Sequence, residues 1–203
     1  MRKKWIFLFA ILALVVFGCK KGETTATDTV TSTAETATST SATETSATTS
    51  TTGTMTAASL SDADKTFVTK AAEGGIAEVN AGQMAATKAA SNDVKDFGNR
   101  MVNDHGKAND ELKALASNKG LTLPTETDAE HKKAADALSK KSGKDFDKTF
   151  MSDMVKDHTA VVAAFEKESK SAQDPDLKSW VTKTLPTLQD HLKMAKQIQS
   201  KVK

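Results

Sequence analysis

The chain has a single cysteine and no tyrosine, and aromatic residues make up only 5% of its 203 positions. With Cys19 alone, neither an intrachain disulfide nor a cluster of thiolate metal ligands can form. Prolines number three, whereas alanine, lysine, aspartate and leucine dominate from about residue 60 onward. That composition favours helices.

No long hydrophobic run is present outside the N-terminus. There, three basic residues at 2–4 precede an apolar run at 5–17, which is typical of an export signal and short for a membrane span. The run ends in a string that resembles a bacterial lipobox, Val16-Phe17-Gly18-Cys19. We therefore expect residues 1–18 to be a lipoprotein signal peptide and Cys19 to carry the lipid. An ordinary signal peptide or an uncleaved anchor, with a chance cysteine, is the alternative.

Residues 24–56 are almost entirely threonine, serine and alanine. Such a segment has too little apolar surface to offset the entropy lost on ordering it. We therefore expect 19–59 to be a lipidated, disordered tether that separates the membrane from a folded part. The remaining residues, 60–203, are about enough for one domain.

Charge of neither sign prevails. The chain has 28 basic and 26 acidic residues, and without the signal the numbers become 25 and 26. Both signs are mixed along the sequence, so no nucleic-acid partner is expected. The one partner that the sequence predicts is a membrane, reached through the lipid on Cys19.

Apolar residues at steps of three and four predict four long helices and one short one. Serines, aspartates and a glycine at suitable positions mark their ends. The expected spans are 62–89, 92–119 and a short helix at 128–140, followed by a third long helix that starts near Ser142 or Gly143 and a last helix that begins at Asp174-Pro175.

One string occurs twice. Phe97-x-x-x-Met101-Val102-x-Asp104-His105 recurs 53 residues later as Phe150-x-x-x-Met154-Val155-x-Asp157-His158. On a helix, residues four apart share a face, so each copy aligns a phenylalanine, a methionine and a histidine along the inward stripe.

The long connection between the second and third long helices predicts a crossover that makes these two helices parallel. His105 and His158 would then lie at one height. The same argument brings Glu78, on an antiparallel first helix rich in small residues, and His191, on the last helix, to a similar level. Four side chains that can bind a metal are therefore expected to converge at the middle of a bundle.

This arrangement resembles the ferritin-like superfamily, an all-α four-helix bundle with one long crossover, here containing a short extra helix. Over residues 62–200 the sequence more closely resembles the uncharacterised bacterial envelope family called domain of unknown function 4142. Members of that family are often labelled outer membrane proteins, and the resemblance implies a lipid-anchored protein of the outer membrane that faces the periplasm or the cell surface. The residues that carry the resemblance are Phe67-Val68, Glu78, Phe97, Met101-Val102, Asp104-His105, Phe146-Asp147, Phe150-Met151, His158 and His191.

The sequence departs from di-iron ferritins. Their sites require Glu-x-x-His pairs, whereas Val102 and Val155 stand three residues before the two repeated histidines. Imidazole and thioether side chains instead suit copper, and imidazole with carboxylate suits zinc. The candidate ligands are His105, His158, His191, Glu78, Met101 and Met154, with Asp104 and Asp157 as acceptors that could orient the imidazoles.

A purely structural interpretation is also open. Each histidine could be a core residue bonded to a carboxylate or a backbone group, and each methionine could simply fill the core. No catalytic triad, phosphate-binding glycine loop or pair of acids is recognisable, so no enzyme is predicted. The first functional hypothesis is a non-catalytic helical bundle of the envelope that acts in binding or stress tolerance. The alternative is a metal-binding envelope protein, and a weaker third is an enzyme using that metal.

Overall fold

The computed structural model describes residues 59–202, which contain five helices and no strand. The predicted signal peptide, the lipidation of Cys19 and the tether up to residue 58 lie outside the described residues. None of the described helices has the length and apolar character needed to cross a bilayer. The helices are α1 (Asp62–Lys88), α2 (Asn92–Asn118), α3 (Ala129–Ser139), α4 (Gly143–Ser171) and α5 (Pro175–Lys201).

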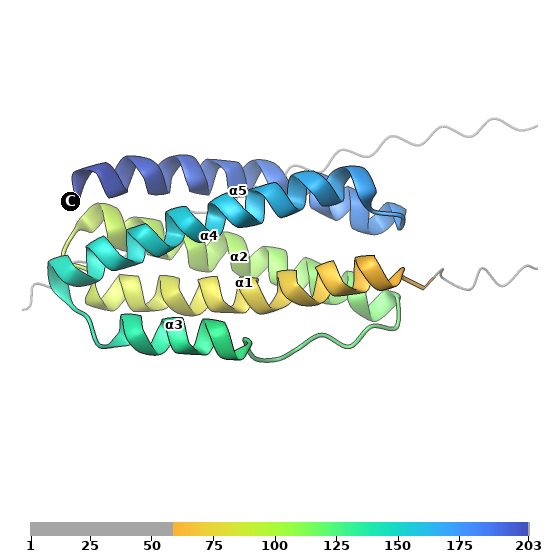
Figure 1. The fold of residues 1–203 in the computed structure, drawn as a ribbon, viewed down its shortest axis with the longest axis horizontal. Coiled ribbons are helices and arrows are strands. Elements are labelled where there is room, and N and C mark those ends of the chain that lie inside the picture. The colour runs from red at the N-terminus through yellow and green to blue at the C-terminus, as the bar shows by residue number, and fades with distance from the viewer. Residues whose placement is uncertain (1–58, 203) are drawn as a thin grey trace, which may run out of the picture. The chain divides into compact units, whose positions relative to one another are not determined.

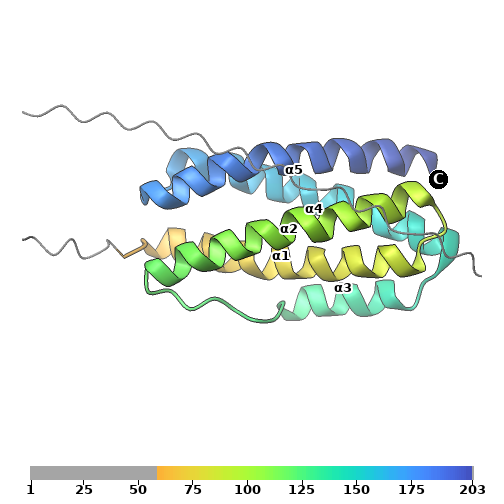
Figure 2. The same cartoon turned by 180° about the vertical axis from the view of Figure 1, so that it is seen from behind.

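The four long helices form two antiparallel hairpins, α1 with α2 and α4 with α5 (Figure 1). Between the hairpins the chain returns along the bundle through α3, so that α2 and α4 run in the same direction (Figure 1). On the opposite side α2 lies beside α5 (Figure 2), and α1 also contacts α4. The predicted ferritin-like bundle with a helix-containing crossover is thereby confirmed.

The helices begin where the sequence marks their starts, although Ser91 and Ser142 precede α2 and α4 without a side-chain capping bond. The side chain of Ser61 accepts a hydrogen bond from the Asp64 N–H, and Asp128 and Asp174 cap α3 and α5 in the same manner. These caps satisfy backbone donors that a helix leaves free in its first turn. Beyond the end of α2, Gly120 has a φ of 69°, a conformation that glycine adopts without strain.

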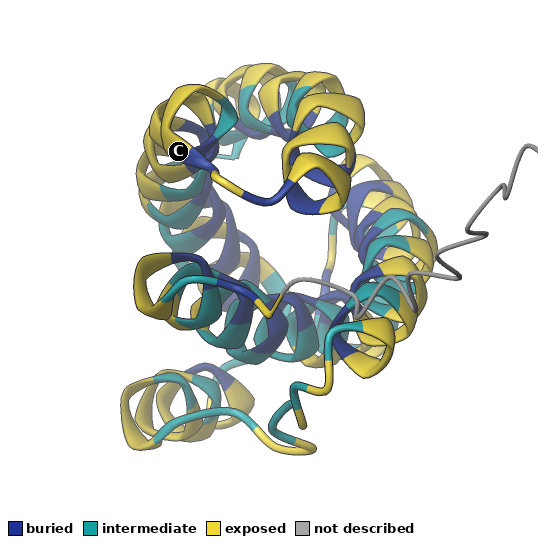
Figure 3. Cartoon of the chain, turned by 90° about the vertical axis from the view of Figure 1, so that its right-hand side faces the viewer, coloured by how far each residue is buried: buried dark blue, intermediate teal, exposed yellow. Residues whose placement is uncertain are grey.

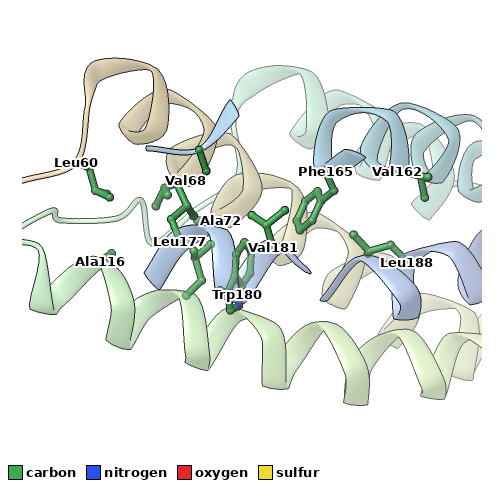
Figure 4. Packing of buried hydrophobic residues seen from close by; sticks show 12 residues of the cluster. Leu60, Val68, Ala72, Ala116, Val162, Phe165, Leu177, Trp180, Val181 and Leu188 are labelled. Atoms are coloured by element: carbon green, nitrogen blue, oxygen red, sulfur yellow. The ribbon is translucent and has the colours of Figure 1, made fainter. Parts of the chain in front are cut away.

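Buried residues face the interior of the ring of four helices, and α3 lies outside it (Figure 3). They form two apolar clusters. The Trp180 cluster (Figure 4) includes Val68, Ala72, Leu112, Phe165, Trp180 and Leu188, and the Phe146 cluster includes Ala85, Phe97, Met101, Phe146, Phe150 and Met154. On every long helix, the residues that separate the two clusters include one buried polar side chain. A polar layer thus divides the core at mid-height.

The α1–α2 hairpin is unusually close near the Phe146 cluster. A Cβ atom added at Gly82 would lie 2.6 Å from the Gly98 carbonyl oxygen, and one added at Gly98 would lie 2.7 Å from the Ala85 Cβ. Both separations are shorter than van der Waals contact allows. Glycine is therefore required at this crossing.

Asp147, in the first turns of α4, fixes that helix to the α1–α2 link. Its two carboxylate oxygens accept hydrogen bonds from the backbone N–H groups of Ala90 and Ser91 at 3.0 and 2.9 Å. The residue is only 3% exposed. This contact sets the height of α4 relative to α2, and therefore the height of His158 relative to His105.

Replacing Asp147 with alanine is expected to destabilise the domain by about 2 kcal/mol, because hydrogen bonds to a charged group contribute about 1.5–3 kcal/mol. Denaturant unfolding followed by circular dichroism measures the change. Asp145→Ala is the control, since Asp145 lies in the same turn but is exposed. Equal stability of the two variants would contradict the assigned role of Asp147.

Candidate metal centre

The polar layer contains one side chain from each long helix. Glu78 comes from α1, His105 from α2, His158 from α4 and His191 from α5. His158 and His191 are completely buried, and His105 and Glu78 are 5% and 7% exposed. The folding of the chain therefore brings together the three histidines and the carboxylate that the sequence singles out.

The three imidazoles lie close enough to share one ion. Their ring centroids are 5.2 to 5.7 Å apart, and one ring nitrogen from each lies within 4.8 Å of the others. Zinc binds imidazole nitrogen at about 2.0–2.1 Å, so small rotations of these side chains would bring all three nitrogens to a common centre.

Each imidazole uses one nitrogen in a contact with an oxygen atom. His158 Nδ1 is 3.0 Å from the Met154 carbonyl oxygen, four residues earlier on α4, and His191 Nε2 is 2.9 Å from Asp104 Oδ2. His105 Nδ1 lies 3.0 Å from Glu78 Oε2. A carbonyl can only accept, so His158 carries its proton on Nδ1 and keeps a lone pair on Nε2.

The opposite nitrogens have no hydrogen-bond partner among residues 59–202. They are Nε2 of His105, Nε2 of His158 and Nδ1 of His191, and all three are buried. Buried polar atoms are nearly always paired, because leaving one unpaired costs about 1–3 kcal/mol. Three unpaired nitrogens on neighbouring rings in one layer are donors of the kind that a transition metal ion binds.

Burial keeps the histidines neutral. It lowers the pKa of His105 to about 3 and that of His158 to about 4, and it also lowers the pKa of His191. Burial, together with the charge of Asp157, raises the pKa of Glu78 to about 8. Burial alone would raise the pKa of Asp104, but its hydrogen bonds to His191 and Arg100 lower it. Neutral imidazole is the form that binds a metal.

The metal-free domain is expected to lose stability as the pH falls from about 6.5 to about 4. In that range the unfolded state takes up protons on His105, His158 and His191, whose folded pKa values are lower than the ordinary 6.5. Glu78 opposes this between pH 4.5 and about 8, because its folded form holds the extra proton. The melting temperature of chelator-treated protein should therefore fall with acid, and less steeply in His158→Leu. A melting temperature independent of pH in both proteins would contradict these pKa values.

The two aspartates of the repeat have different surroundings. Asp104 contacts both His191 and, at 3.1 Å, Arg100. Asp157, expected in the same orienting role, forms no hydrogen bond or ion pair with a histidine among the described residues, and His131 influences it through charge alone. Position 153, which corresponds to Arg100 in the repeat, is a second aspartate, and this part of α4 faces a cavity beside α3.

Met101 and Met154 are buried within the Phe146 cluster, where both side chains fill the core. Met154 also supplies the carbonyl that holds His158, a role that sequence reasoning missed. No residue pattern marks this contact, because the acceptor is a backbone carbonyl. The fourth histidine, His131, lies on α3, away from the ring of four helices.

A cavity of about 160 Å³ adjoins the polar layer on the side of the Trp180 cluster. Glu78 and His105 line one part of it, and Phe67, Phe165 and Trp180 line another. The layer is thus in contact with a space large enough for a small molecule or several waters.

Comparison with known proteins agrees with this fold. A family model described as a domain of unknown function (DUF4142) matches residues 49–198, and no curated protein matches the chain. The crystal structure of a DUF305 fragment from Deinococcus radiodurans is similar, with a TM-score of 0.58 and 12% identity over 71% of this chain and 99% of that one. At such low identity this likeness concerns the fold alone. Because the family model covers more than half of the chain, the protein belongs to the DUF4142 family, which confirms the resemblance noted from its repeated motif.

Proposed function

We propose that the protein binds one zinc or copper ion through His105, His158 and His191. The observation that carries this proposal is the set of three buried imidazole nitrogens that lack a partner and lie in a single layer of the core. An ion at their centre would satisfy all three at once.

A purely structural role explains the contacts of only one nitrogen in each imidazole. Contacts with Glu78, with the Met154 carbonyl and with Asp104 use one nitrogen of each ring. If these histidines served only to link helices, a side chain with one polar atom would do the same without the free-energy cost of a second, unpaired nitrogen. Metal ligation accounts for both nitrogens, since a ligating histidine usually donates its second N–H to a carboxylate or a carbonyl.

The donors favour zinc and copper over the other common ions. Three neutral imidazoles suit both metals. Magnesium and calcium instead prefer oxygen ligands, whereas the three proposed ligands here are nitrogens. Valines at 102 and 155 occupy the positions where di-iron proteins carry glutamate, so a di-iron centre is not supported. Three ligands leave a fourth position free, and the cavity beside His105 would offer room for a water or small ligand there.

The predicted lipid on Cys19 and the tether over 19–59 indicate where in the cell the protein would bind metal. We infer a metal-binding lipoprotein of the cell envelope, held at the outer membrane and facing the periplasm or the cell surface. The lipobox-like string supports the anchor, and the composition of the tether supports a separation between membrane and bundle.

Metal titration of the full-length chain, purified in detergent and stripped with a chelator, tests the proposal. We expect one equivalent of Zn²⁺ or Cu²⁺ to bind and, at a hundredfold excess over Kd, to raise the melting temperature by roughly 5–10 °C. Mg²⁺ is the control and should leave the melting temperature unchanged. Absence of binding by both transition metals would refute the proposal.

A further inference from the structure

The cavity of about 160 Å³ beside the polar layer lies in the middle of the bundle, because all four long helices contribute to its lining. Small residues leave this space unfilled, namely Ala71 and Gly74 on α1, Ala108 on α2 and Ala164 on α4. A Cβ atom added at Gly74 would meet nothing within 4 Å. An empty space of this size loses packing contacts that one larger side chain would recover, so it is unfavourable for the fold alone.

Three aromatic rings in a row form one wall of this cavity. The ring centroids of Phe67 and Phe165 are 5.1 Å apart, edge to face, and those of Phe165 and Trp180 are 5.5 Å apart. All three residues line the cavity, and Phe165 and Trp180 lie between the helices in Figure 4. Aromatic rings attract a further ring at centroid separations of about 4.5–7 Å, so this wall suits an aromatic ligand.

The lining of the cavity offers a buried ligand no charged partner. Burial lowers the pKa of His105 to about 3, and burial together with the charge of Asp157 raises the pKa of Glu78 to about 8, so both side chains are neutral at neutral pH. Lys70 is the one other ionisable side chain of the lining, and it is exposed. An ionised ligand inside would lack a counter-charge, which is costly. The cavity therefore favours an uncharged ligand.

Water has few polar partners in this cavity, although a buried water typically makes about three hydrogen bonds. The Thr184 hydroxyl already donates to the Trp180 carbonyl oxygen at 2.8 Å. Glu78 and His105 contact each other at 3.0 Å. An apolar cavity of about 150 Å³ in a protein core can stay dry and bind benzene. The cavity beside the polar layer is of similar volume and also has mostly apolar walls.

We propose that this cavity binds a small uncharged aromatic molecule, of about the size of benzene or toluene, with its ring packed against Phe67, Phe165 and Trp180. Small-molecule sites are typically concave and mostly apolar, as this one is. Such binding does not depend on the proposed metal site. Because His105 and Glu78 also line the cavity, the ligand would lie against the polar layer.

Equilibrium dialysis of radiolabelled toluene against the chelator-treated full-length chain in detergent tests the proposal. One equivalent is expected to bind, with a dissociation constant on the order of 0.1 mM, which is within the range open to so small a ligand. Ala71→Leu, at the same detergent concentration, fills the cavity and should bind toluene at least about tenfold more weakly without a lower melting temperature. The matched control is Ala163→Leu, which adds the same atoms at an exposed position of α4 outside the cavity and should keep wild-type binding.

Two competitors test the chemical class. Benzoate carries a charge on the same ring and should displace toluene at least about tenfold less well. Methylcyclohexane has the carbon skeleton of toluene without its π system. After subtraction of their different transfer free energies from water to alkane, toluene should bind at least about threefold more tightly.

Equal uptake of toluene by the wild type and by folded Ala71→Leu would overturn the proposal, because the micelles alone would then account for it. If Ala71→Leu does not fold, Ala164→Leu fills the cavity from α4 and carries the same expectation. Benzoate binding as tight as that of toluene would also overturn the proposal, because the ligand would then lie at Lys70 on the surface. Equal corrected affinities for toluene and methylcyclohexane would overturn the aromatic class. All samples are metal-free, so none of these results bears on the proposed metal site.

Discussion

Replacing both His105 and His158 with alanine is expected to weaken zinc or copper binding by on the order of 1,000-fold or more. The two residues supply two of the three nitrogen donors, and the double variant would keep only the imidazole of His191 in the polar layer. One imidazole gives little affinity compared with a site of three converging ligands. Isothermal titration of chelator-stripped protein measures the loss directly.

His131→Ala is the matched control, because it removes the remaining histidine of the chain from the outer helix α3. It should keep wild-type affinity and stoichiometry. Circular dichroism must show that the double variant is still helical, so that loss of binding reports on the site. An affinity within tenfold of wild type in the folded double variant would contradict the assignment of these ligands.

Gly82→Ala is expected to destabilise the domain by about 1–3 kcal/mol, as does overpacking elsewhere in protein cores. The new methyl group would lie 2.6 Å from the Gly98 carbonyl oxygen, and backbone yields less readily than a side chain. Helices α1 and α2 would have to move apart next to the polar layer, on the side of the Phe146 cluster. Chemical denaturation of the metal-free protein measures the change.

Gly74→Ala provides the same substitution on the same helix without the clash, since no atom lies within 4 Å of the added carbon. It should stabilise the domain by up to about 1 kcal/mol, because alanine is the better helix former. The two variants thus have opposite predicted signs. The close packing assigned to Gly82 would be wrong if both changed stability in the same direction by similar amounts.

Much of the fold follows from local signals. The caps at Ser61, Asp128 and Asp174 lie where the sequence marks helix starts, and Gly120 lies just beyond the end of α2. The length of the connection between α2 and α4 requires the crossover, which makes these helices parallel. Parallel helices that carry the same motif then place their histidines side by side.

What the sequence could not predict depends on how helices are rotated and on which atoms they face. Asp104 and Asp157 occupy equivalent positions of the repeat, but of the two only Asp104 forms a hydrogen bond with one of the three central histidines, because α2 borders α5 there and α4 borders α3. The Met154 carbonyl that holds His158 is a backbone group, which no residue pattern reveals. The oxygen atoms of Glu78, Met154 and Asp104 likewise decide which nitrogen of each imidazole is left without a hydrogen bond.

The mid-height layer also distinguishes this bundle from di-iron four-helix bundles. Its mid-height layer has one polar side chain from each long helix, and three of the four are neutral imidazoles. The two apolar clusters on either side isolate that layer from the ends of the bundle. A single ion with nitrogen ligands suits such a layer better than a pair of irons bridged by carboxylates.

The most direct measurement is a crystal structure of the zinc-soaked protein with diffraction data collected on both sides of the zinc absorption edge. The proposed metal site predicts one anomalous peak inside the bundle, about 2.0–2.1 Å from Nε2 of His105, Nε2 of His158 and Nδ1 of His191. Glu78, the Met154 carbonyl and Asp104 should keep their contacts with the opposite nitrogens. A bundle without an internal peak, or a zinc ion bound only by surface residues, would contradict it.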